Sequence, residues 1–104
     1  MDDPTFEYQL GEFEDRVYFL TARARPGFDD PEEFAATVRY NDPATDETVQ
    51  IARIDTTHGY AHFDRLYRRD EPKERLEVDL WEAIELLEEN WRTYAASYGE
   101  KQTE

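Results

Sequence analysis

The sequence predicts an α+β fold, in which a four-stranded antiparallel meander has one long C-terminal helix packed across one face. Segments with strand-like alternation follow one another up to about residue 69 and are separated by turn residues. The segment after Asp79 instead carries apolar residues at helical spacing. Seven tyrosines, six phenylalanines and two tryptophans provide large apolar groups for a core, so we expect the chain to fold despite its low mean hydropathy.

The first two expected strands have clear boundaries. Residues 16–25 have an apolar centre and are stopped by Pro26 and Gly27. Residues 33–41 alternate in character along the chain, which predicts a half-buried strand. One face of this strand would consist of Phe34, Ala36, Val38 and Tyr40.

A hairpin and a fourth strand are expected next. The turn residues at 41–44 connect to a third strand at 48–56. The fourth strand, at 60–69, would run back antiparallel and end before a charged loop that contains Pro72.

Residues 5–15 fit two patterns. Phe6, Leu10 and Phe13 have the spacing of a helix, whereas Phe6, Tyr8 and Leu10 alternate like a strand. Periodicity alone does not decide between the two.

The C-terminal helix has the strongest local signals. Asp79 and Glu82 form a capping pair at its start, and Gly99 is expected to end it. A single apolar stripe runs along its length: Leu80, Ile84, Leu87, Trp91, Tyr94 and Tyr98. Such a stripe suits either a core or a partner-binding surface, and we expect it to lie on the sheet.

The charge of the chain indicates its habitat. It has 26 acidic and 12 basic residues, for a net charge of -14, and its only lysines are Lys73 and Lys101. The resulting repulsion is largely screened at molar salt, where the Debye length is about 3 Å. This composition is typical of a halophilic protein, and an acidic interaction domain from another kind of organism is the alternative.

Length and composition favour one cytoplasmic domain. The chain is expected to form a single domain over 1–104, with frayed ends at about 1–4 and 100–104. Cysteine is absent, which excludes disulfides and thiolate metal sites. We expect no membrane association, because no apolar run approaches the about 20 residues that span a bilayer and no signal peptide is evident.

Residues 51–75 are the expected location of any site. They hold six basic residues, five acidic residues and both histidines, whereas the other 79 residues carry a net charge of -15. A roughly neutral segment is where a phosphate or an acidic partner can approach an acidic protein. Pairing of arginines with carboxylates on neighbouring strands explains the same balance without any site.

The two histidines carry the candidate chemistry. Histidine is the side chain that titrates near neutral pH, so a general acid or base would be His58 or His62. A metal-free ribonuclease also needs a cation to stabilise the phosphate. In a regular strand His62 and Asp64 share a face while Arg65 points to the other. The alternative is a structural role, with the imidazoles bonded to carbonyls or carboxylates. The candidate catalytic set is His58, His62, Asp64, Arg53, Arg65 and Lys73.

A metal site is a second option for the same histidines. Together with Asp55 or Asp64 they would form a group of two histidines and one carboxylate. Gly59 and the surrounding β-pattern place them on a turn and a strand, where their spacing is not diagnostic. We therefore expect neither a metal nor a cofactor.

The segment from Ile54 to Asp64, followed by Pro72, Lys73 and a helix, resembles small haloarchaeal proteins of a family without an assigned function. It is also similar to the TumE-like toxins of toxin–antitoxin modules, which are small α+β proteins. The resemblance covers the C-terminal half of the chain.

This resemblance implies roles for residues on two strands. Arg53 and Asp55 would match the pair that the toxins carry on one strand, an arginine or tyrosine and an aspartate. His58 and His62 would match their histidines on the next strand. At residues 63–65 this chain has Phe-Asp-Arg where the toxins have a histidine–lysine–histidine run.

Two functions from different classes follow. The first is a non-enzymatic domain that acts by protein association, as a homodimer or with another protein, through tyrosines and arginines of its strands. The alternative is a metal-free ribonuclease or toxin-like protein of a toxin–antitoxin module, with RNA as its partner. DNA binding is not expected, because the charge opposes it and high salt removes the gain from counterion release.

The charge also predicts that stability depends on salt. We expect the Tm to rise steeply between dilute buffer and molar KCl, because added ions screen the repulsion among carboxylates. Thermal unfolding followed by circular dichroism at several KCl concentrations measures this. A Tm that does not respond to salt would contradict the halophilic interpretation.

Overall fold

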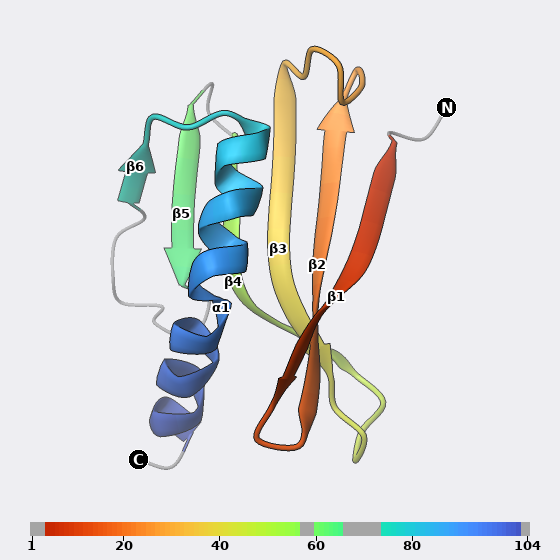
Figure 1. The fold of residues 1–104 in the computed structure, drawn as a ribbon, viewed down its shortest axis with the longest axis vertical. Coiled ribbons are helices and arrows are strands. Elements are labelled where there is room, and N and C mark those ends of the chain that lie inside the picture. The colour runs from red at the N-terminus through yellow and green to blue at the C-terminus, as the bar shows by residue number, and fades with distance from the viewer. Residues whose placement is uncertain (1–3, 57–59, 66–73, 103–104) are drawn as a thin grey trace.

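Six antiparallel strands and one helix make up the fold of the residues described. The structure, a computed structural model, describes residues 4–56, 60–65 and 74–102, without the side chains of the last three. The strands lie in the sheet in chain order, and each neighbouring pair is antiparallel. Figure 1 shows the helix lying across one face of this sheet. The elements are β1 Thr5–Phe13, β2 Arg16–Arg25, β3 Glu33–Asn41, β4 Thr48–Asp55, β5 Ala61–Arg65, β6 Glu74–Leu76 and α1 Leu80–Gln102.

The predicted α+β class is confirmed, with an antiparallel sheet followed by a C-terminal helix, but the described part of the chain forms six strands rather than four. β2 and β3 have the predicted bounds, and β4 ends one residue before the predicted end. Residues 66–69 of the fourth expected strand lie outside the described residues. The two additional strands are β1, where the pattern was ambiguous, and β6, whose three residues are too short to show alternation.

Two β-bulges account for the irregular spacing of apolar residues. In β1 the extra residue is Leu10, which lies between Gln9 and Gly11 at the point where the register shifts. In β4 the extra residue is Ile51, and both Ile51 and Ala52 are fully buried. A bulge adds one residue to a strand and so interrupts the two-residue alternation. The helix-like spacing of Phe6, Leu10 and Phe13 therefore results from the bulge in this strand.

α1 begins as predicted and ends later than predicted. The Glu82 backbone amide donates a hydrogen bond to Asp79 Oδ1 at 2.8 Å, and the Asp79 amide donates one to Glu82 Oε1 at 3.1 Å. Gly99 does not end the helix, which continues to Gln102. A glycine disfavours a helix by only about 1 kcal/mol, and the adjacent Tyr98 still packs against Tyr40 of the sheet.

The apolar stripe of α1 is buried on the sheet, as expected. Leu80 and Leu87 are fully buried, and Trp91 is nearly so. They meet the inward residues of β2 and β3, among them Leu20 and Val38, which are also fully buried. Burial of each such aliphatic side chain contributes about 1.5–3 kcal/mol. This packing occupies one face of the sheet.

A chain of aromatic rings joins the second half of α1 to the sheet. The Trp91 and Tyr18 ring centroids are 5.2 Å apart, and those of Tyr18 and Tyr40 are 5.4 Å apart. The Tyr40 hydroxyl donates a hydrogen bond of 3.3 Å to the Tyr98 hydroxyl, which extends the chain of rings to the end of α1. Burial raises the pKa of both Tyr18 and Tyr40. The Arg16 guanidinium lies 4.5 Å from the Tyr40 ring centre and covers this cluster.

Gly11 is required where β1 passes close to Trp91. Its φ is 157°, and a Cβ at this position would lie 3.0 Å from Trp91 Cζ2. The Trp91 ring is buried, so moving it aside would disturb a closely packed core. We expect Gly11→Ala to lower the free energy of unfolding by about 1–3 kcal/mol, as measured by chemical denaturation. The matched control is Gly27→Ala, because no atom lies within 4 Å of the added Cβ. An equal loss in both variants would contradict the role of the Trp91 contact.

Candidate functional site

No helix or strand among the described residues covers the second face of the sheet, which we call the helix-free face. Residues directly opposite one another on neighbouring antiparallel strands point to the same side, so the register defines this face. One row of residues crosses all six strands: Thr5, Arg23, Ala35, Asp55, His62 and Arg75. The next row crosses five strands: Glu7, Thr21, Thr37, Arg53 and Asp64.

Positive and negative charges balance on the helix-free face. It holds five of the eight arginines whose side chains the structure describes, together with five carboxylates. The chain as a whole has a net charge of -14. The balance therefore sets this face apart from the acidic remainder of the molecule. Its charged residues are Arg23, Arg25, Arg39, Arg53, Arg75, Glu7, Glu12, Glu33, Asp55 and Asp64.

One group of contacts, built around the ion pair of Arg39 and Glu7, links β1, β2 and β3. Glu7 Oε2 accepts hydrogen bonds from Arg39 Nε at 3.2 Å and from Thr21 Oγ1 at 3.0 Å. The bond from Arg39 is the main reason that the pKa of the Glu7 carboxyl is lowered. The Arg39 guanidinium also lies 4.8 Å from the ring centre of Phe19. These contacts hold the Arg39 side chain flat on the face.

A second group of ion pairs links β4 and β5. Arg53 Nε lies 3.0 Å from Asp55 Oδ2, and Arg53 Nη2 lies 3.9 Å from Asp64 Oδ2. The Asp55 side chain is 15 % exposed, so this pair is partly sheltered from water and less screened than a surface pair. The positive charge of Arg53 is therefore shared between two carboxylates.

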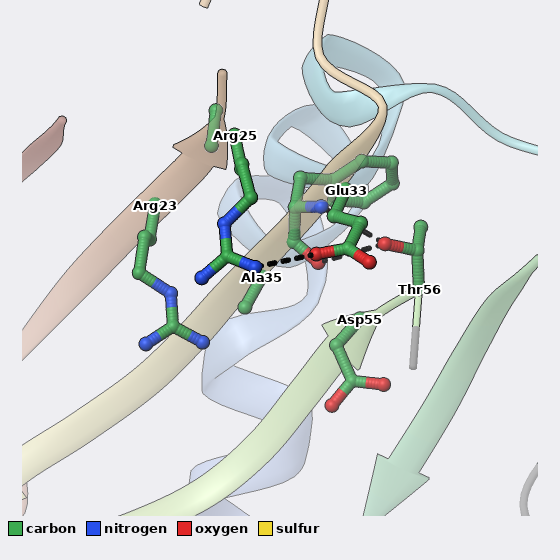
Figure 2. Close-up of a pocket in the computed structure, with 8 residues that line it drawn as sticks. Arg23, Arg25, Glu33, Ala35, Asp55 and Thr56 are labelled. Atoms are coloured by element: carbon green, nitrogen blue, oxygen red, sulfur yellow. Dashed lines mark hydrogen bonds and ion pairs between the residues drawn. The ribbon is translucent and has the colours of Figure 1, made fainter. Parts of the chain in front are cut away.

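A hollow of about 270 Å³ opens where β2 and β4 end and β3 begins (Figure 2). Ala35 forms its floor, because its short side chain stands between Arg23 and Asp55 in the row. The Phe34 amide donates a hydrogen bond to Thr56 Oγ1 at 2.9 Å, which fixes the end of β4. The residues that line the hollow are Arg23, Ala24, Arg25, Glu33, Phe34, Ala35, Asp55 and Thr56.

The structure brings three of the six predicted site residues together on the helix-free face. These are Arg53, His62 and Asp64. His62 lies directly opposite Asp55, and its ring centroid is 4.3 Å from that of Tyr60. His62 is only 9 % exposed and does not line the hollow.

Of the other three predicted residues, the structure describes one, Arg65, which is not part of this group. Arg65 points to the helix side of the sheet, where its guanidinium lies 4.8 Å from the ring centre of Phe63. This separation of Arg65 from His62 agrees with the alternation of the sequence. His58 and Lys73 lie outside the described residues.

Several residues of this face were not predicted as site residues. Arg23 and Arg25 alternate with Ala22 and Ala24 in β2, and this pattern is the signal that places both arginines opposite the core. Arg75 was counted among the charges of the neutral segment, but its position was not predicted. Its guanidinium lies 4.3 Å from the ring centre of Tyr60.

A metal centre was an alternative for the histidines. Within residues 4–56, 60–65 and 74–102, no three histidine or carboxylate side chains form a group that could hold a metal ion. This finding covers Asp55, His62 and Asp64, whereas His58 lies outside it. The same part of the chain contains no helix that is long and apolar enough to cross a membrane.

The fold and this face define a class of protein: a small α+β domain in which one helix covers one face of an antiparallel sheet and charged residues occupy the other. The family described as "Domain of unknown function (DUF7718)" matches residues 1–104, and the chain belongs to this family. This match agrees with the expected membership of a family without an assigned function. Comparisons with curated proteins and with solved structures gave no match.

Proposed function

We propose that the chain acts by associating with a second copy of itself through the helix-free face. The observation that carries this proposal is that, among the described residues, five arginines and five carboxylates balance on one face of a chain with a net charge of -14. A two-fold interface pairs the same patch with itself. A patch with a net charge repels its copy, whereas a balanced patch can place opposite charges together.

The size of the face and its exposed apolar groups support the proposal. The molecule measures 40 × 27 × 23 Å, so the sheet face accommodates the about 800 Å² per partner that a standard interface buries. Val17 and Tyr60 are each 38 % exposed. Both belong to this face, because Val17 lies opposite Glu12 and Tyr60 packs against His62. Tyrosine and arginine are enriched in protein interfaces.

The substitution Ala35→Glu tests this association. Ala35 lies within the row that crosses the sheet, so glutamate would add both bulk and an unbalanced charge to the interface. We expect the dissociation constant of the dimer to rise at least about tenfold, which corresponds to about 1.4 kcal/mol. Sedimentation equilibrium in molar KCl measures this constant.

Ala44→Glu is the matched control for this variant. Ala44 is exposed in the loop between β3 and β4, so the same change there should leave the dimer intact. Thermal unfolding of both variants shows whether the sheet itself is preserved. A wild-type chain that stays monomeric would refute self-association and leave another protein as the partner of the face.

We propose metal-free cleavage of RNA as a second candidate function. The observation that favours it is that His62 lies directly opposite Asp55, which is paired with Arg53 and lines the hollow with Arg23. In such a reaction a base takes the proton of a 2′-hydroxyl, whose oxygen attacks phosphorus. An acid then protonates the leaving 5′-oxygen, and arginine stabilises the charge on the phosphate. The resemblance of the sequence to TumE-like toxins concerns the same residues, because it matches Arg53, Asp55 and His62 to residues of those toxins.

Cleavage of an unstructured fluorogenic RNA in the presence of EDTA tests this second function. We expect His62→Gln to lower the rate at least about 100-fold, because His62 would act as general acid or base. Arg92→Gln, on α1, should cleave at the wild-type rate. Unchanged thermal unfolding of His62→Gln would show that the loss is chemical. The ribonuclease proposal fails if the wild-type chain does not cleave RNA under these conditions.

A further inference from the structure

In the part of the chain that the structure describes, the two carboxylates of the hollow are paired with guanidinium groups, whereas one of its arginines is not paired with a carboxylate. Arg25 Nη1 lies 3.4 Å from Glu33 Oε2, and Arg53 Nε lies 3.0 Å from Asp55 Oδ2. Each carboxylate of the hollow therefore has a guanidinium partner. Among the described residues, no hydrogen bond or ion pair holds Arg23, whose side chain is exposed. Arg23 thus supplies a positive charge that remains available to a ligand.

The spacing of Arg23 and Arg25 suits a tetrahedral oxyanion. Figure 2 shows both side chains on the β2 side of the hollow, with Asp55 and Thr56 on the β4 side. Residues two apart on one face of a strand are separated by about 7 Å. A phosphate that accepts hydrogen bonds of about 2.8 Å from each guanidinium spans this separation.

The ion pair of Arg25 with Glu33 does not prevent such binding. The Arg25 and Glu33 side chains are 63 % and 60 % exposed, and an exposed pair of this kind contributes only about 0–1 kcal/mol. A dianionic phosphate interacts more strongly with a guanidinium than a single exposed carboxylate does. It can therefore displace Glu33 from Arg25.

We propose that the hollow binds the phosphate group of a small phosphomonoester between Arg23 and Arg25, above the floor formed by Ala35. Arginine suits this role because its planar guanidinium donates two parallel hydrogen bonds to one phosphate. The volume of about 270 Å³ leaves space beside the phosphate for the organic part of the ligand. The proposal concerns only the groups of this hollow and does not rest on dimer formation or on RNA cleavage.

Titration of the ¹⁵N-labelled chain with inorganic phosphate, at constant ionic strength and followed by NMR, tests the site. We expect saturable shifts at the amides of Ala35 and Thr56 and at the Arg23 Nε signal. Arg23→Gln should weaken binding at least tenfold. Asp55→Asn should tighten it at least twofold, because the change removes a negative charge from the lining of the hollow, while Arg53 keeps only Asp64 as its carboxylate partner. The matched control is Arg92→Gln, which removes the same charge from α1 and should leave the affinity unchanged.

Glycerol 3-phosphate and acetate complete the experiment. Glycerol 3-phosphate should bind at least as tightly as inorganic phosphate, and weaker binding would overturn the assignment of a phosphomonoester. Acetate that binds as tightly as phosphate would overturn the preference for phosphate. Shifts that do not saturate, or equal weakening in Arg23→Gln and Arg92→Gln, would overturn the site itself. Sedimentation in the same buffers reports separately on the proposed dimer.

Discussion

Burial of the apolar stripe of α1 is the constraint on which the rest of the structure depends. One helix with one stripe covers only one face of a sheet. Its packing places Leu20 and Val38 inside, and because side chains alternate along a strand, their neighbours in the sequence point to the opposite face. A register slip of one residue in either strand would move its apolar side chains to the helix-free face and its charged side chains into the core. The charged pattern of the helix-free face is thus determined by packing on the other side of the sheet.

The parts of the fold that were predicted are those in which one local rule holds without interruption. β3 alternates in residue character over its whole length, β2 is an apolar segment stopped by Pro26 and Gly27, and α1 begins with a capping pair. β1 was ambiguous because the bulge at Leu10 imitates helical spacing. Its connection to β2 was also hard to recognise, because Glu14 and Asp15 adopt φ values of 50° and 66° in place of the usual Asn-Gly of such a turn.

The candidate site was predictable only within single strands. Alternation alone separates Arg65 from His62 and Asp64 in β5. In β4, however, counting from the apolar Ile51 would place Arg53 and Asp55 in the core. The bulge at Ile51 reverses the alternation and turns both residues to the helix-free face. The row from Arg23 to Arg75 depends on the register of every strand between them, which sequence periodicity does not report.

The bulge of β1 also bears on how the chain avoids aggregation. β1 is an edge strand of nine residues, and a regular edge of that length is a template for pairing with other chains. The carboxylate of Glu12 discourages such pairing in dilute solution, but dissolved ions screen its repulsion. A bulge instead bends the strand and interrupts its row of amides and carbonyls, whatever the salt concentration. The backbone at Gly11 therefore protects this edge under conditions in which charge does not.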